Sequence, residues 1–330
     1  MIFSEYMERW LYGEEGYYRT FRPIGKEGDF YTAVSTSPFF GAAIANFLCK
    51  NIRDGRIPRD AALVEIGAHQ GYLLADMIQW LYTCDAPLLD SMRFIIVERQ
   101  LHVREAQRAY FAERFGEAVH LEQVESLDAL DLPYAFFVSN EIFDAFPCNL
   151  YIDGKTAEIR DDAVLWQDAD EAILSVARKY GMQKGEIAVG YEAFAKRVAG
   201  AAERFDFISF DYGDRYARND FSIRIYDQHT VYPFFDEAVN LSELFGHSDM
   251  TYDVNFAHVM DAFAAEGVNT AAYETQARAL IRFGLIDLLE QYARHASEAQ
   301  YLHEADKVKT LIAPNVMGER FKMIHLQKQQ

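Results

Sequence analysis

Short apolar runs alternate with amphipathic stretches through the middle of this 330-residue chain, and that alternation limits its fold more than any other feature. Residues 62–66 are predicted to form a buried strand, and apolar residues recur at helical spacing after Gly71. A second strand is predicted at 93–97, and further elements are expected at 119–121, 135–138 and 205–210 (strands) and 191–198 (helix). This pitch predicts right-handed strand–helix–strand crossovers, and therefore an α/β fold with a mostly parallel sheet.

The remaining segments do not follow this alternation. Helical patches at 6–11 and 39–49 precede the first strand, and a hairpin with an Asp153-Gly154 turn is expected within 150–185, followed by a polar helix. Near the end, the pattern predicts a strand at 268–273, one long helix at 279–292 and a final strand at 321–326. We therefore expect an N-terminal helical segment over 1–60 and an α/β domain over 61–330, with insertions near 150–185 and 214–265.

Charge and composition exclude several functional classes. The chain has 32 basic and 51 acidic side chains, and its net charge of −19 opposes non-specific attraction to nucleic acid. No apolar run reaches the ~18–20 residues of a membrane helix, so no membrane insertion is expected. The start of the chain lacks the features of a secretory signal, and a cytoplasmic location is expected.

Cysteine and histidine patterns predict neither a disulfide framework nor a metal site. The three cysteines, Cys49, Cys84 and Cys148, are far apart in the sequence and form no CxxC pair. The histidines show no HExxH motif or ligand spacing, so no metal is expected.

A glycine-containing turn directly follows the first predicted strand, in the run Glu65-Ile66-Gly67-Ala68-His69-Gln70-Gly71. Glycine at a strand-to-helix turn lets the backbone bend sharply and lets a ligand lie against bare main chain. The second strand ends in Glu98, where a carboxylate can accept from both hydroxyls of a ribose. The turn lacks the three glycines of the NAD fingerprint and the GK[ST] of a phosphate loop. It fits either a nucleoside-cofactor site, with an acidic residue typical of S-adenosylmethionine (SAM) binding, or an ordinary tight connection.

Two further strands end in acidic segments. Asn140, Glu141 and Asp144 follow the fourth strand, and Asp211-Tyr212-Gly213 follows the fifth. Ligands of open α/β sheets bind beyond the carboxyl ends of strands, so the first group would line the same crevice as Glu65 and Glu98. The alternatives are helix-capping side chains in the first segment and a plain turn in the second.

Taken together, these motifs resemble the MidA family of class I SAM-dependent methyltransferases, which is related to a mitochondrial complex I assembly factor that methylates protein arginine. The matching stretches occur in family order over nearly the whole chain: the tyrosine-rich segment at 6–18, Gly25 to Ala33, the glycine turn, Glu98, residues 140–147, Asp211-Tyr212-Gly213, Ile223 to Tyr226 with His229, residues 249–256, and Met317 to Lys322.

The resemblance implies a Rossmann-like, seven-stranded sheet whose last strand is antiparallel, with SAM as the cofactor. Residues 1–60 would close over this cofactor. The implied cofactor-binding residues are Asp29, Phe30, Thr32, Glu65, Gly67, Gly71, Glu98 and Asn140.

The implied reaction is methylation of an arginine in a partner protein, for which a respiratory-complex subunit is one candidate. Because a guanidinium stays protonated, carboxylates must hold it and localise its charge. Glu141 and Asp144 are the predicted catalytic residues, and His229 is a candidate base or a structural hydrogen-bonding residue.

The chain departs from the family pattern at two places. His69 replaces a third glycine in the turn, and Val34-Ser35 replaces the usual Pro-Glu after Ala33. Two alternatives therefore remain: a methyltransferase of the same fold with a small-molecule acceptor, and a catalytically silent assembly scaffold. A homodimer also remains open.

Overall fold

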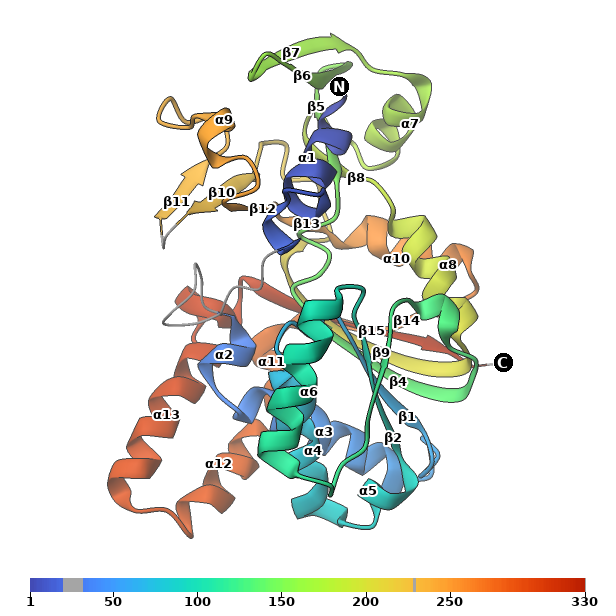
Figure 1. Cartoon of the computed structure of the whole chain (residues 1–330), viewed down its shortest axis with the longest axis vertical. Coiled ribbons are helices and arrows are strands. Elements are labelled where there is room, and N and C mark those ends of the chain that lie inside the picture. The colour runs from blue at the N-terminus through green and yellow to red at the C-terminus, as the bar shows by residue number, and fades with distance from the viewer. Residues whose placement is uncertain (20–31, 228–229, 330) are drawn as a thin grey trace. The chain divides into compact units, whose positions relative to one another are not determined.

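The computed structural model describes residues 1–19, 32–227 and 230–329 (Figure 1). The chain divides into two compact units, and each is assembled from three separate segments. Unit 1 comprises Met1–Phe30, Glu141–Ala195 and Tyr212–Ala265, whereas unit 2 comprises Tyr31–Asn140, Lys196–Asp211 and Glu266–Gln330. Helix α8 (Tyr191–Ala201) and strand β9 (Ala202–Asp214) contain residues of both units.

Unit 2 is built on a large sheet in which seven strands follow the order β14-β15-β9-β4-β1-β2-β3. Besides β9, these strands are β1 (Ala62–Ile66), β2 (Arg93–Val97), β3 (Leu121–Val124), β4 (Leu132–Asn140), β14 (Asn269–Thr275) and β15 (Phe321–Lys328). Pairing is parallel between β1 and β2, β1 and β4, β2 and β3, and β4 and β9, whereas β15 is antiparallel to β14. The predicted mostly parallel α/β sheet with an antiparallel last strand is confirmed.

The helices of unit 2 bury their apolar faces as the sequence pattern predicts. Helix α4 has no buried polar residue and places Leu74, Met77, Ile78 and Leu81 in the core. The helices are α2 (Ala33–Thr36), α3 (Phe39–Arg53), α4 (Tyr72–Asp85), α5 (Leu88–Ser91), α6 (Leu101–Phe115), α11 (Gln276–Arg282), α12 (Leu285–Ala293) and α13 (Glu298–Ile312), with a 3₁₀ turn at Leu127–Ala129 and a π turn at Pro314–Gly318.

The single long helix predicted at 279–292 is wrong, because the structure has two helices, α11 and α12, separated at Phe283 and Gly284. Gly284 has φ +93°, a left-handed conformation that a regular helix excludes. Asn46 Nδ2 donates to Phe283 O at 2.7 Å. A side chain of α3 thus makes a hydrogen bond to the carbonyl at the break. The local apolar pattern of 279–292 did not reveal this interaction.

Unit 1 contains two antiparallel sheets. The four-stranded sheet has the order β7-β6-β5-β8, and the three-stranded sheet has the order β11-β10-β12. Their strands are β5 (Cys148–Ile152), β6 (Lys155–Arg160), β7 (Ala163–Asp168), β8 (Lys184–Ala188), β10 (Arg224–Asp227), β11 (Thr230–Pro233) and β12 (Asp249–Thr251); the other elements are β13 (Val254–Asn255), α1 (Phe3–Tyr12), α7 (Glu171–Lys179), α9 (Leu241–Leu244), α10 (Phe256–Ala265) and a 3₁₀ turn at Tyr17–Arg19. The predicted hairpin is β5–β6, whereas β7 and β8 were not predicted.

The aromatic residues near the N-terminus belong to the core of unit 1. Phe3, Tyr6 and Trp10 of α1 are buried, and Trp10 Nε1 donates to Ser248 O at 2.7 Å. This aromatic face of α1 therefore packs within unit 1. Across the parts of the chain that the structure describes, no helix is both long enough and apolar enough to cross a bilayer.

Candidate functional site

The turn between β1 and α4 contains three residues in the left-handed region of backbone space. Gly67 has φ +71°, His69 has φ +46° and Gly71, the N-cap of α4, has φ +82°. Two of these positions are glycine, the residue that adopts this conformation at least cost, and histidine tolerates it better than most side chains. The predicted tight turn therefore forms with His69 in place of a glycine.

Buried amides hold the turn in place through its main chain. Gln107 of α6 is fully buried, and its Nε2 donates to His69 O at 2.7 Å. Its Oε1 in turn accepts from Gln123 Nε2 of β3 at 2.7 Å. The sequence analysis missed both glutamines, because one polar residue in an amphipathic stretch does not reveal its partner.

Gly71 is required by packing as well as by its dihedral angles. A Cβ added there would lie 2.9 Å from Phe111 Cε2 and 3.3 Å from Ile96 Cδ1. The start of α4 therefore lies directly against β2 and α6. The main chain of the turn, which has no side chain at Gly67 or Gly71, lies at the carboxyl edge of the sheet.

Glu65 lies inside β1, beneath the first turn of α4. Its Oε2 accepts from Leu74 N at 3.0 Å, which satisfies one of the free amide groups at the helix start. Burial raises the pKa of Glu65 to about 8, although the Leu74 amide opposes that shift. Glu65 thus connects the strand before the turn to the helix after it.

Register places Gly67, Glu98 and Asn140 at the same edge of the sheet. Ile66 pairs with Val97, so Gly67 is level with Glu98. Glu65 pairs with Val138, so Gly67 is also level with Asn140, two residues further along β4. The sequence analysis expected Asn140, Glu141 and Asp144 to line one crevice with Glu65 and Glu98, and the parallel register brings Asn140 level with the start of the glycine turn and with Glu98.

The Glu98 carboxylate accepts from Gln100 N through Oε1 at 2.8 Å. Burial raises its pKa, and the Gln100 amide and the guanidinium groups of Arg99 and Arg104 oppose that shift. No described residue bonds its other oxygen, Oε2. His102 Nε2 and, in the turn, Gln70 Oε1 are buried and have no hydrogen-bond partner among the described residues. A nucleoside with hydroxyl and amino groups fits this edge, which has an acceptor and unsatisfied polar atoms.

Thr32 caps the short helix α2. Its Oγ1 accepts from Ser35 N, and Ser35 Oγ accepts from Thr32 N at 3.0 Å, which is a capping box. Ser35 stands where the sequence resemblance to the MidA family would place glutamate, and it retains the reciprocal cap. Asp29, Phe30 and His229, the other residues proposed from the sequence, lie outside the described residues.

In unit 1, Glu141 and Asp144 occupy one segment but differ in their environments. Glu141 is partly buried and has φ +53°, a strained conformation for a non-glycine residue. Asp144 is buried, and its Oδ2 accepts from the Tyr212 hydroxyl. Burial raises the pKa of Asp144 to about 6, while the Tyr212 hydroxyl and the Arg224 guanidinium oppose the shift.

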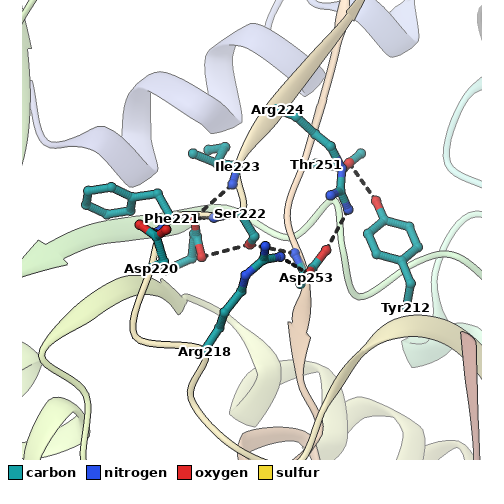
Figure 2. Close-up of polar contacts among 10 residues, drawn as sticks. Tyr212, Arg218, Asp220, Phe221, Ser222, Ile223, Arg224, Thr251 and Asp253 are labelled. Carbon is teal, nitrogen blue, oxygen red and sulfur yellow. Dashed lines mark hydrogen bonds and ion pairs between the residues drawn. The ribbon is translucent and has the colours of Figure 1, made fainter. Parts of the chain in front are cut away.

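Tyr212 belongs to a side-chain network that reaches well beyond Asp144. Its hydroxyl lies 2.5 Å from Thr251 Oγ1, and the Arg224 guanidinium lies 4.7 Å from the centre of its ring (Figure 2). Arg224 pairs with Asp253 at 2.7 Å, and Arg218 binds the same carboxylate at 2.8 Å.

Glu186 anchors the other end of this network. It accepts from the backbone amides of Ser222 and Ile223 at 2.7 and 2.9 Å, and the Ser222 hydroxyl binds both Glu186 and the amide of Asp253. The Glu186 carboxylate thus fixes the segment that presents Arg224 to Tyr212.

Asp211-Tyr212-Gly213 is not a plain turn, because it continues strand β9. Gly213 pairs with Val254 of β13, and a Cβ on Gly213 would lie 2.1 Å from Val254 O. Only glycine allows β13 to approach this closely. The motif therefore serves strand pairing and holds Tyr212 in place.

The strand order, the glycine turn and the acidic residue after β2 define a class of proteins, the Rossmann-like methyltransferases. The chain belongs to a family described as S-adenosyl-L-methionine-dependent methyltransferases, whose model matches residues 43–274. Family membership confirms SAM as the expected cofactor.

Two crystal structures resemble the whole chain. A protein from Burkholderia thailandensis, bound to S-adenosyl-homocysteine, is 24% identical with a TM-score of 0.84, covering 99% of this chain and 88% of its own. Another structure of a protein from the same organism is 26% identical with a TM-score of 0.80, covering 99% and 87%. These likenesses establish the fold. No curated protein matches the sequence significantly.

Proposed function

We propose that this methyltransferase methylates an arginine side chain of a partner protein, as the resemblance to the MidA family implies. The observation that most supports this acceptor is the segment holding Glu141, whose backbone is strained, and the buried Asp144. Strain at a non-glycine residue often accompanies function, because surrounding structure must maintain it. A subunit of a respiratory complex is the partner that the family relationship suggests.

In this proposal, the cofactor is held mainly by the edge of unit 2. Gly67 and Gly71 provide bare main chain for the methionine and ribose side, Glu65 holds the turn to α4, and Glu98 accepts from the ribose hydroxyls. When bound, SAM supplies an electrophilic methyl group. Asp29, Phe30, Thr32 and Asn140 are the further residues proposed to surround it.

Glu141 and Asp144 are proposed to hold the acceptor guanidinium. Carboxylates can localise its charge on the nitrogens that are not being methylated and can accept a proton as the new bond forms. A pKa of about 6 leaves Asp144 largely ionised at neutral pH, as this role requires. His229 is retained as a candidate base.

Methyl-labelled SAM, incubated with the purified protein and a cell lysate, tests the acceptor. We expect protease-sensitive label that elutes as methylarginine after hydrolysis. Glu141→Gln should lower this labelling about 100-fold, whereas Glu237→Gln, an exposed carboxylate of the same unit, should leave it unchanged. Label in a protease-resistant small molecule would instead support the small-molecule alternative.

Calorimetric titration with S-adenosyl-homocysteine separates an enzyme from a silent scaffold. We expect binding that Glu98→Ala weakens about 10- to 100-fold, because a charged hydrogen-bond acceptor is lost. If the folded wild-type protein does not bind the ligand, His69 has closed the site and the scaffold alternative is favoured.

We also propose that residues 1–60 close over the bound cofactor. Hydrogen exchange in this segment should then slow when S-adenosyl-homocysteine is added. Unchanged exchange at saturating ligand would contradict closure without affecting the cofactor assignment.

A further inference from the structure

Helices α3 and α4 of unit 2 pack closely in a constant register. At Gly41 of α3, an added Cβ would lie 2.9 Å from Asp76 Cβ and 3.2 Å from Leu73 O of α4. Gly41 and Asp76 are separated by 35 positions in the sequence, and so are Cys49 and Cys84. The two cysteines thus lie eight residues beyond the first contact, about 12 Å further along each helix at 1.5 Å per residue.

The two cysteines at this second position are neighbours. Cys49 is buried, Cys84 is partly exposed, and Cys84 lies close enough to raise the pKa of Cys49. Arg53, one helical turn after Cys49 on the same helix, donates through Nη2 to Cys84 Sγ at 2.8 Å. Two thiols that are distant in the sequence therefore lie beside the same guanidinium.

The surroundings of the two thiols differ in a way that suits thiol–disulfide exchange. The attacking sulfur must be accessible, and a guanidinium that donates to it can stabilise the negative charge that it carries during the attack. Arg53 lies on Cys84, and a second guanidinium, that of Arg59, pairs with the adjacent Asp85 at 2.9 Å. Burial raises the pKa of Cys49, which keeps this inner thiol protonated until its neighbour has reacted.

We propose that Cys49 and Cys84 are a reversible disulfide-forming pair, and hence a modification site on unit 2 that is independent of methyl transfer. Its oxidant is a low-molecular-weight disulfide. The Cys84 thiolate attacks one sulfur of that disulfide and releases the other half as a thiolate, forming a mixed disulfide on Cys84. Cys49 then loses its proton to solvent, attacks Cys84 Sγ and releases the second half as a thiolate. Two protein thiols are oxidised, and one small disulfide is reduced to two thiols.

The third cysteine cannot substitute for either partner. Cys148 lies in unit 1, is buried, and contacts the Met7 sulfur at 3.7 Å. Cys148→Ser is therefore a control that removes a thiol and leaves the pair intact.

The test treats the reduced, full-length protein with glutathione disulfide and maps its thiols by mass spectrometry. We expect a Cys49–Cys84 cross-link, a loss of two hydrogen atoms from the protein mass, and reversal by dithiothreitol. Cys148→Ser should give the same cross-link, and Cys49→Ser should stop at a glutathione adduct on Cys84.

Two results in the wild-type protein would overturn the proposal. One is a glutathione adduct that persists on Cys84 without closing. The other is no reaction at all in the folded protein when all three thiols react after unfolding. Neither depends on the folding of a variant. As a second measurement, Arg53→Gln should slow the first step several-fold, whereas Arg56→Gln, whose guanidinium binds Asp54 instead, should not.

Discussion

The glycine turn of unit 2 and the Asp144 segment of unit 1 both contain buried carboxylates, but they use them differently. Around the glycine turn the buried polar side chains bind main chain, as Glu65 does with Leu74 N and Gln107 does with His69 O. Around Asp144 the side chains bind one another, and the Tyr212 hydroxyl contacts both Asp144 and Thr251. A backbone amide or carbonyl remains as a hydrogen-bond partner when its residue is substituted. In a network of side chains, each substitution removes a hydrogen-bond partner.

This difference explains how the turn accommodates His69. Its geometry depends on a few backbone conformations and on one carbonyl, and at position 69 both survive a change of side chain. The network around Tyr212 has no such tolerance, because its members satisfy each other's buried polar groups. Substitutions in the two regions should therefore have different consequences.

The largest expected effect is at Gly71. Gly71→Ala should lower the free energy of unfolding by about 2–5 kcal/mol, because it combines a left-handed dihedral angle with a collision against Phe111. It should also abolish S-adenosyl-homocysteine binding in calorimetry. Gly55→Ala is the matched control, since Gly55 has φ +72° and nothing within 4 Å of its added Cβ. Equal costs would mean that packing at Gly71 contributes nothing.

A pH-dependent effect is expected at Glu65. Its pKa of about 8 exceeds the ordinary 4.5, so the folded protein binds more protons between these values and loses stability as pH rises from 4.5 to 8. Glu65→Gln should remove this slope and gain about 4–5 kcal/mol over wild type above pH 8. Urea unfolding across this window measures it, with the exposed Glu117→Gln as control. A slope retained in Glu65→Gln would assign the dependence to another group.

A smaller effect is expected in the side-chain network. Tyr212→Phe removes the donor to Asp144 and should lower the free energy of unfolding by about 2 kcal/mol. The pKa of Asp144 should rise above 6, which extends the range of pH over which increasing pH destabilises the protein. Urea unfolding at several pH values measures both changes. Tyr82→Phe, on a side chain that is 58% exposed, should change neither.

The smallest effect is expected at the cap of α2. Ser35→Ala should cost about 1 kcal/mol by removing one half of the capping box with Thr32. Ser35→Glu introduces a side chain that can also complete a capping box and should retain wild-type stability, as thermal unfolding can show. Equal losses in both variants would mean that the reciprocal cap is not what stabilises this segment.

Much of the sheet in unit 2 could be predicted, because its central strands are short runs of buried apolar residues. The ends of strands were less predictable. In β3 the run Leu121-Glu122-Gln123-Val124 is half polar and only partly buried, so the expected strand at 119–121 began too early. The break in the helix predicted at 279–292 depends on Asn46, a residue of another helix, and no local pattern contains that information.

The site shows the same limit. Spacing after the glycine turn was enough to place Glu98 at the edge of the sheet, because parallel register follows from the topology. Gln107 and the Tyr212 hydroxyl could not be assigned, since their partners are distant in sequence and become neighbours only in the folded chain. The proximity of Cys49 and Cys84 was not predicted for the same reason.

Strand β15 lies between β14 and β9, although it follows every other element of the sheet in the sequence. During translation, the interior of the sheet therefore remains open until Phe321–Lys328 leaves the ribosome. The backbone edges of β9 and β14 stay unpaired until this strand is made, and exposed strand edges invite association with other chains. Nascent copies of this protein should consequently depend on chaperones until β15 has been synthesised.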